Sequence, residues 1–221
     1  MVTMTERTVT GKAVRASATR ELILTTAERL FAQHGLAAVS NRQVSEAAGQ
    51  GNNAAVGYHF GTKADLVRAI VHKHADHIEE LRTRMLAQLG DSADVRDWVG
   101  CLVRPIAEHL AALGNPTWFA RFNAQMMTDP AFRAIMVEEG LSSPSLRRII
   151  DGLNRCVSDL PVAVRSERSD MAGLLLVHSF AGRERALAER LPTPRASWDG
   201  AATGLIDAIV GLWMAPVTPH C

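Results

Sequence analysis

The sequence predicts an all-α protein in which three short N-terminal helices precede a larger helical domain. Apolar residues recur at helical spacing through most of the 221 residues, and no segment alternates polar and apolar residues as a half-buried strand does. Hydrophobic residues make up 47% of the chain, which is enough for a sizeable core. We divide the chain into a flexible basic arm over 1–18, a three-helix domain over 19–64 and a helical domain over 65–221.

The three N-terminal helices are separated by turns that contain glycine. The first is expected over Thr19–His34 and stops before Gly35, a residue that suits a helix C-terminus. The second begins at Ser40, and Gln43 three residues later completes a capping box. The third is expected over 53–60. Three short helices, of which the second and third are separated by only a short turn, form a helix-turn-helix arrangement. In this arrangement the third helix enters the major groove of DNA.

The remaining helices continue to the C-terminus. Thr62 is expected to cap a fourth helix that reaches Leu89, and no Pro- or Gly-rich linker interrupts it, so the two domains should be rigidly coupled. The further helices are expected over Val95–Leu113, Pro116–Met127, Pro130–Glu139, Pro144–Val157, Val164–Arg190 and Ser197–Met214.

Charge, hydropathy and cysteine content narrow the classes of function. The net charge is +1, but residues 1–63 carry seven Lys and Arg against four Asp and Glu, a net of +3, so the head of the chain is its basic part. No apolar run approaches the roughly 20 residues of a membrane helix. The polar start lacks the apolar core of a secretory signal, and we expect a cytoplasmic protein. The three cysteines are far apart, which favours buried thiols over disulfides or structural zinc; no metal or cofactor is expected.

The third predicted helix is poor in apolar residues and rich in small and polar ones. Short side chains let a helix lie deep in the major groove, where Asn pairs with adenine and Ala contacts a thymine methyl. The donors after it suit phosphate, because the amides and dipole of the fourth helix add to them. The groove-facing candidates are Asn52, Asn53, Ala54, Ala55 and Gly57, and the phosphate candidates are Tyr58, His59, Thr62 and Lys63.

Simpler interpretations exist for some of these residues. Asn52 and Asn53 also suit a turn, since Asn tolerates left-handed backbone. Tyr58 and Phe60 are both possible core aromatics; we accept this for Phe60 and favour phosphate contact for Tyr58, which lies near Lys63 in the sequence.

Three runs of this sequence together resemble the DNA-binding domain of the TetR family of transcriptional regulators. They are Ala27–Gly35, Val44–Gly49 and Tyr58–Leu66, and the resemblance covers Thr19 to Leu66. It implies a dimer in which the second helix contacts DNA through Ser40, Arg42 and Gln43, the third helix faces bases, and Tyr58, His59 and Lys63 hold phosphates. Lys12 and Arg15 of the arm would reach the adjacent minor groove.

The C-terminal domain offers two candidate sites. Large, polarizable side chains predict either ordinary core or a ligand cavity with His109 or Asn123 as a polar hook. They are Trp98, Cys101, His109, Trp118, Phe122, Asn123 and Met126. The last two helices carry apolar and small residues that suit either internal core or a four-helix interface with a second copy, which the resemblance favours. The interface candidates are Leu174, Val177, His178, Leu205, Ile209 and Leu212.

A trio of histidines, His72, His74 and His77, lacks the supporting carboxylate or cysteine of a metal site, so we interpret it as solvated or interhelical. The favoured function is a repressor that a small-molecule ligand releases from a palindromic DNA operator. The alternatives are a constitutive DNA-binding dimer without a ligand and a small all-α enzyme, although no motif of catalysis is present in the sequence.

Overall fold

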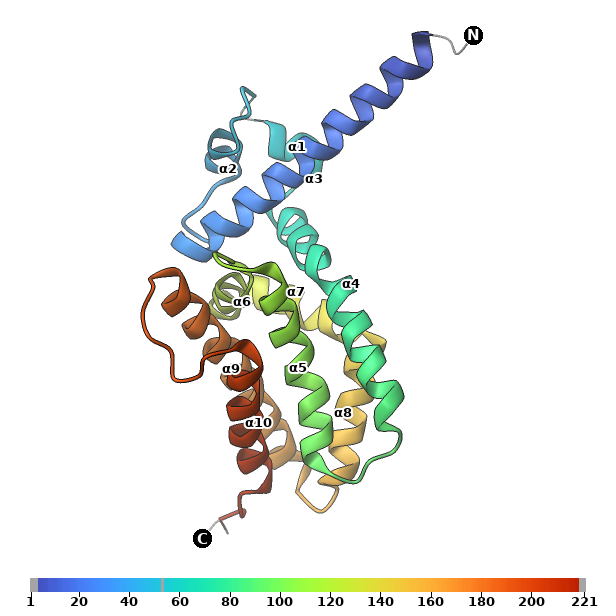
Figure 1. The fold of residues 1–221 in the computed structure, drawn as a ribbon, viewed down its shortest axis with the longest axis vertical. Helices are drawn as coiled ribbons and strands as arrows, with labels where there is room; N and C mark the ends of the chain where they lie inside the picture. The colour runs from blue at the N-terminus through green and yellow to red at the C-terminus, as the bar shows by residue number, and fades with distance from the viewer. Residues whose placement is uncertain (1–3, 53, 219–221) are drawn as a thin grey trace. The chain divides into compact units, whose positions relative to one another are not determined.

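The computed structural model describes residues 4–52 and 54–218, with side chains from residue 14 onward. All regular structure within these ranges is helical, which confirms the predicted all-α class (Figure 1). No helix within them is long and apolar enough to cross a membrane. The helices are α1 Met4–His34, α2 Asn41–Ala47, α3 Ala55–Phe60, α4 Lys63–Leu89, α5 Val95–Leu113, α6 Phe119–Thr128, α7 Pro130–Ser142, α8 Pro144–Cys156, α9 Val162–Ala188 and α10 Trp198–Met214.

The chain forms two compact units. Unit 1 is Met1–Lys73 and unit 2 is His74–Cys221. Helix α4 begins in unit 1 and continues into unit 2, so the division between the units lies inside a helix. The domain boundary that we expect after residue 64 stays a prediction.

Helix α1 is longer than the sequence predicted. It begins at Met4, whereas apolar periodicity predicted a start near Thr19 after an irregular arm. The prediction of the helix start was wrong because residues 4–18 have little apolar periodicity, yet they contain no proline that would end a helix.

Unit 1 is built on a small apolar core that α1, α2, α3 and the start of α4 share. Its innermost members are each exposed by 2% or less: Ile23, Leu24, Phe31, Val44, Val56, Leu66 and Ile70. The Nζ of Lys73 on α4 lies 3.2 Å from Glu21 Oε1 and 3.4 Å from the buried Glu28 Oε2 on α1. These ion pairs hold α4 against α1 at Lys73, the last residue of unit 1.

Unit 2 is organised around α5, which packs against α8 and α10, while α9 contacts α6 and α10. The largest fully buried side chain of its core is Trp98, which donates a hydrogen bond from Nε1 to the Ser92 carbonyl (2.9 Å). Gly152 on α8 lies against this indole, and a Cβ at Gly152 would be only 2.3 Å from Trp98 Cδ2. The close approach of α8 to α5 therefore depends on a glycine at this position.

Two carboxylates join helices of unit 2 by capping helix N-termini. Glu184 on α9 accepts hydrogen bonds from the Ala120 and Arg121 amides (3.0 and 2.9 Å) and pairs with Arg121 Nε (2.9 Å). Glu79 on α4 accepts from the Ser143 and Ser145 hydroxyls (2.6 and 2.7 Å). Burial raises the pKa of Glu79, but hydrogen bonds from both serines outweigh burial, and the pKa lies below its usual range.

Candidate nucleic-acid interface

The interface begins with helix α2, whose first turn is fixed by a capping box. The Ser40 amide donates to Gln43 Oε1 (2.8 Å), and the Gln43 amide donates to Ser40 Oγ (3.2 Å). At the inner side of α2, the buried Ser45 hydroxyl donates to the Asn41 carbonyl (3.1 Å) and accepts from the Val56 amide of α3 (3.3 Å). One hydroxyl therefore sets how α3 lies against α2.

The turn before α3 depends on Asn52. Its Oδ1 accepts a hydrogen bond from the Ala54 amide (2.9 Å), and its carbonyl accepts from the Ala55 amide (3.0 Å). This geometry is the turn-forming role that we weighed for Asn52. Asn53 lies outside the described residues.

Most of the predicted DNA-contacting side chains are exposed. Those of α2 and the turn into α3 are Ser40, Arg42, Gln43, Asn52 and Ala54, and those of α3 are Gly57 and Tyr58. Tyr58 is 84% exposed, which rules out the core interpretation of this side chain. Ala55 is only 8% exposed, so the expectation that it faces bases was wrong, because its methyl group lies in the buried part of α3 together with Val56.

A row of rings continues from Tyr58 along the end of α3. The Tyr58 and His59 rings lie 5.1 Å apart edge to face, and the His59 and Phe60 rings lie 6.4 Å apart. Phe60 is half-buried, as we predicted for a core aromatic. The guanidinium of Arg20 on α1 lies over its ring, 4.8 Å from the centre. Arg20 was not among the predicted site residues, because its position beside α3 is a tertiary contact without a local signal.

Thr62 caps the start of α4 as predicted, since its hydroxyl accepts a hydrogen bond from the Asp65 amide (3.1 Å). Asp65 Oδ2 accepts from the Thr62 hydroxyl (2.6 Å) and amide (3.0 Å), so a carboxylate already occupies this helix N-terminus. These hydrogen bonds lower the pKa of Asp65. The Lys63 Nζ donates to the Leu36 carbonyl and lies over the Phe31 ring. Lys63 therefore joins α4 to the α1–α2 loop in this structure, and its assignment to a DNA phosphate stays a prediction.

Two basic residues of the predicted interface, Arg42 and Arg15, lie where contact with DNA requires a further change. Arg42 on α2 pairs with Glu46 one turn later (2.8 Å), a hydrogen bond that raises the pKa of Arg42. A DNA phosphate would have to compete with Glu46 for this exposed guanidinium. Arg15 is exposed on α1, whereas the Lys12 side chain is not among those described. A helix about 10–12 Å wide does not enter a minor groove of about 6 Å, so insertion of the arm requires α1 to unwind there.

The predicted ligand residues of unit 2 lie in more than one place. Trp98 and His109 are eleven residues apart on α5, about 16 Å along the helix. Trp98 packs on α8, whereas His109 Nε2 lies 2.8 Å from His74 Nδ1 on α4. Of the others, Cys101, Phe122 and Met126 are buried, and Trp118 and Asn123 are half-buried. Burial raises the pKa of the Cys101 thiol. That some of these residues line a ligand cavity stays a prediction.

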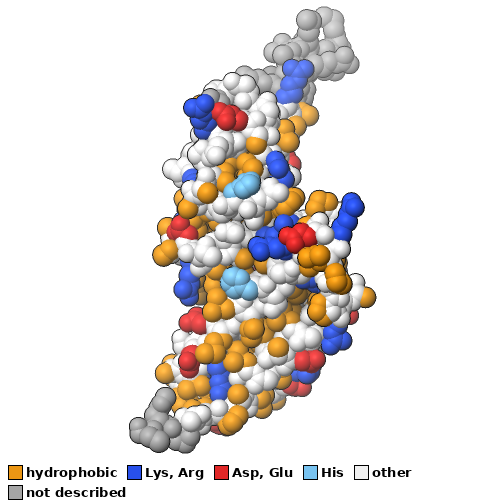
Figure 2. All heavy atoms as spheres, turned by 90° about the vertical axis from the view of Figure 1, so that its left-hand side faces the viewer, with side chains coloured by type: hydrophobic (Ala, Val, Ile, Leu, Met, Phe, Trp, Pro, Cys, Tyr) orange, Lys and Arg blue, Asp and Glu red, His pale blue; other side chains and the backbone are white. Residues whose placement is uncertain are grey.

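The predicted interface residues of unit 2 divide into buried and exposed groups. Leu205 and Ile209 on α10 are 7% and 0% exposed and belong to the core, so placing them in an interface was wrong. Apolar spacing alone does not distinguish an inward face from an outward one. Leu174 and His178 on α9 line a surface groove of about 620 Å³, and Leu212 on α10 completes it. Val177 is half-buried. Figure 2 shows hydrophobic side chains gathered over the lower half of one face of the molecule.

The histidines behave as predicted where the structure describes their contacts. His74 is buried and makes the interhelical contact with His109, and His77 is exposed. No group of three His, Cys, Asp or Glu among the described residues is placed to hold a metal ion.

Comparison with known proteins points to the helix-turn-helix segment. Residues 23–70 match the family described as "Bacterial regulatory proteins, tetR family". Two curated relatives, both from Pseudomonas putida, are each 34% identical to this chain over 90 residues. They are the "Probable HTH-type transcriptional regulator ArpR" and the "HTH-type transcriptional regulator TtgR". Each alignment covers 39% of this chain and 39% of the relative, so the match is confined to less than half of either protein.

Proposed function

We propose that this chain, whose residues 23–70 belong to the tetR family of bacterial regulatory proteins, is a DNA-binding transcriptional regulator. The observation that carries the proposal is the exposed face of α2 and α3, where a short helix fixed by Ser45 presents Gly57 and Tyr58 to solvent. Small residues permit a close approach to the major groove, and Tyr58 adds a donor for phosphate. Such a role would place the protein in the cytoplasm with the chromosome.

The same proposal includes a homodimer that forms through α9 and α10. Leu174, exposed by 45%, and Met171, exposed by 41%, line the groove that Leu212 completes. Exposed apolar side chains of this kind suit a self-complementary interface between two copies. Two heads related by twofold symmetry would read a palindrome whose half-sites lie about 34 Å apart.

The finer mechanism is repression that a small-molecule ligand relieves. Its support is helix α4, which belongs to both units and gives a change in unit 2 a covalent path to unit 1. A ligand shifts the equilibrium only by its different affinity for the two states. A thermal-shift screen separates this mechanism from a constitutive dimer, because a ligand that binds the native state raises the melting temperature. A ligand that raises the melting temperature but leaves operator affinity unchanged would contradict the switch.

DNA selection with the purified full-length protein tests the central proposal. Random duplexes are enriched over several rounds at a fixed salt concentration, since phosphate contacts make affinity depend on salt. We expect an enriched palindrome. A folded protein that enriches no sequence at low salt would overturn the assignment as a sequence-specific regulator and would return attention to unit 2 as a site of other activity.

The dimer is tested by placing a charge in the groove. Leu174→Glu should convert a dimer into a monomer in light scattering, because the interface would have to bury a carboxylate without a partner. The matched control is Val137→Glu on α7, where an apolar side chain is 53% exposed but lies outside the groove. If Leu174→Glu remains dimeric, the interface is elsewhere.

A further inference from the structure

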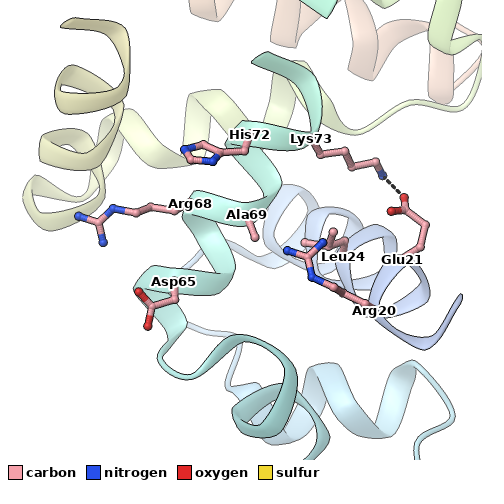
Figure 3. Close-up of a pocket in the computed structure, with 8 residues that line it drawn as sticks. All are labelled: Arg20, Glu21, Leu24, Asp65, Arg68, Ala69, His72 and Lys73. Carbon is pink, nitrogen blue, oxygen red and sulfur yellow. Dashed lines mark ion pairs between the residues drawn. The ribbon is translucent and has the colours of Figure 1, made fainter. Parts of the chain in front are cut away.

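Arg20 on α1 is the starting point of this inference. Its side chain extends from α1 over Leu24 toward the start of α4, beside a pocket of about 360 Å³ in unit 1 (Figure 3). The guanidinium carbon lies 4.8 Å from the centre of the Phe60 ring at the end of α3. An aromatic face at this distance attracts a cation and restricts its orientation.

The acidic residues that line this pocket are engaged elsewhere. Glu21 Oε1 lies 3.2 Å from the Lys73 Nζ, an ion pair that Figure 3 marks. Asp65 Oδ2 accepts from the Thr62 hydroxyl at 2.6 Å and from its amide at 3.0 Å. Arg20 itself makes no ion pair with any residue in the described part of the chain. Its positive charge therefore lies beside the Phe60 ring without an ion-pair partner among the described residues.

The position of this charge relates it to the proposed DNA surface. The Phe60 ring lies near both the Arg20 guanidinium and the His59 ring, and the His59 ring lies 5.1 Å from that of Tyr58. Arg20 is thus connected through Phe60 and His59 to the exposed Tyr58. If α3 lies in the major groove, we expect the Arg20 guanidinium to lie beside the groove. There it would meet the sugar-phosphate backbone and not the bases.

We propose that Arg20 binds a phosphate of the DNA backbone beside the recognition helix α3, with Phe60 as the residue that positions its guanidinium. The inference rests on the proposed DNA-binding function. Phosphate is the anion that suits this group, because a guanidinium presents two parallel N–H donors that match two phosphate oxygens. Since a phosphate carries no base identity, the contact adds affinity and register on DNA without changing the preferred sequence.

The first test compares the full-length protein with its Arg20→Gln and Arg20→Lys variants on the selected duplex over a series of salt concentrations. Arg20→Gln should lower affinity about tenfold and reduce the slope of log affinity against log salt by about 0.9 for each bound head. Arg20→Lys should keep the slope but bind several-fold more weakly, because an ammonium lacks the planar fork. The matched control is Arg147→Gln, which removes an exposed arginine of α8 in unit 2 and should change neither quantity.

A purely structural role for Arg20 is separated by neutralising single phosphates. Duplexes with one methylphosphonate at successive positions should reveal a phosphate whose neutralisation weakens the wild type about tenfold and leaves Arg20→Gln unaffected. If every position weakens both proteins equally, or if Arg20→Gln retains the full salt slope, the inference is overturned. Phe60→Leu, verified as folded by circular dichroism, should lose part of the same coupling. Failure of the wild type to select any DNA would instead overturn the proposed function.

Discussion

The recognition surface of unit 1 and the predicted ligand region of unit 2 are built in opposite ways. In unit 1 the predicted site residues are close together in sequence and most of them are exposed, as Tyr58 is at 84%. In unit 2 the predicted residues are distant in sequence and largely buried, as Trp98 is at 0%. The sequence reveals a surface that binds a macromolecule when its polar residues lie close together along the chain. Buried aromatic residues give the same sequence pattern whether they fill a core or line a cavity.

The strongest test of this contrast is Trp98→Ala. If Trp98 is core, the truncation leaves a cavity, and we expect the free energy of unfolding to fall by about 3–5 kcal/mol. Chemical denaturation measures the loss. Trp118→Ala serves as the comparison, since Trp118 is half-buried and stacks on Arg121 with its ring centre 4.3 Å from the guanidinium carbon. A loss for Trp98→Ala that is no larger than that for Trp118→Ala would indicate that Trp98 lines an existing cavity.

The opposite change, a larger residue at the same contact, should cost less. Gly152→Ala places a methyl group 2.3 Å from Trp98 Cδ2, so α8 must move away from α5. We expect a loss of about 1–3 kcal/mol in denaturation experiments. Gly100→Ala on α5 is the control, because its added Cβ meets no atom within 4 Å apart from the backbone of its own helix. Equal stability for the two variants would contradict the close packing of α8 on α5.

Helices and the helix-turn-helix order were predictable because they depend on local signals. The Ser40–Gln43 capping box and the apolar spacing of Ile23, Ala27 and Phe31 determine where chain segments become helical and which side is buried. The roles of Lys63 and Arg20 depend on residues 27 and 40 positions away, Leu36 and Phe60. Such contacts leave no trace in local spacing, so the sequence alone shows neither the contact of Lys63 with Leu36 nor the place of Arg20 beside Phe60.

A third test uses a substitution that should weaken DNA binding without changing the free energy of unfolding. Tyr58→Ala removes a side chain that is 84% exposed, so the free energy of unfolding should change by less than about 0.5 kcal/mol. Affinity for the selected duplex should fall about tenfold, equivalent to about 1.4 kcal/mol, from one lost phosphate contact. Fluorescence anisotropy measures the affinity. Unchanged affinity would remove Tyr58 from the interface and weaken the contrast between the units.

The smallest expected effect is at the Thr62–Asp65 cap of α4. Hydrogen bonds from Thr62 lower the pKa of Asp65 in the folded protein, so the cap stabilises the fold above the ordinary carboxyl pKa of about 4 and is lost as pH falls through the lowered value. Wild type should therefore be more stable than Asp65→Ala at neutral pH, and the difference, measured by chemical denaturation, should shrink at about pH 3. Because the carboxylate is fully exposed, the effect should be smaller than those at Trp98 and Gly152. A difference that is independent of pH would mean that the side chain acts by packing and not as a charged cap.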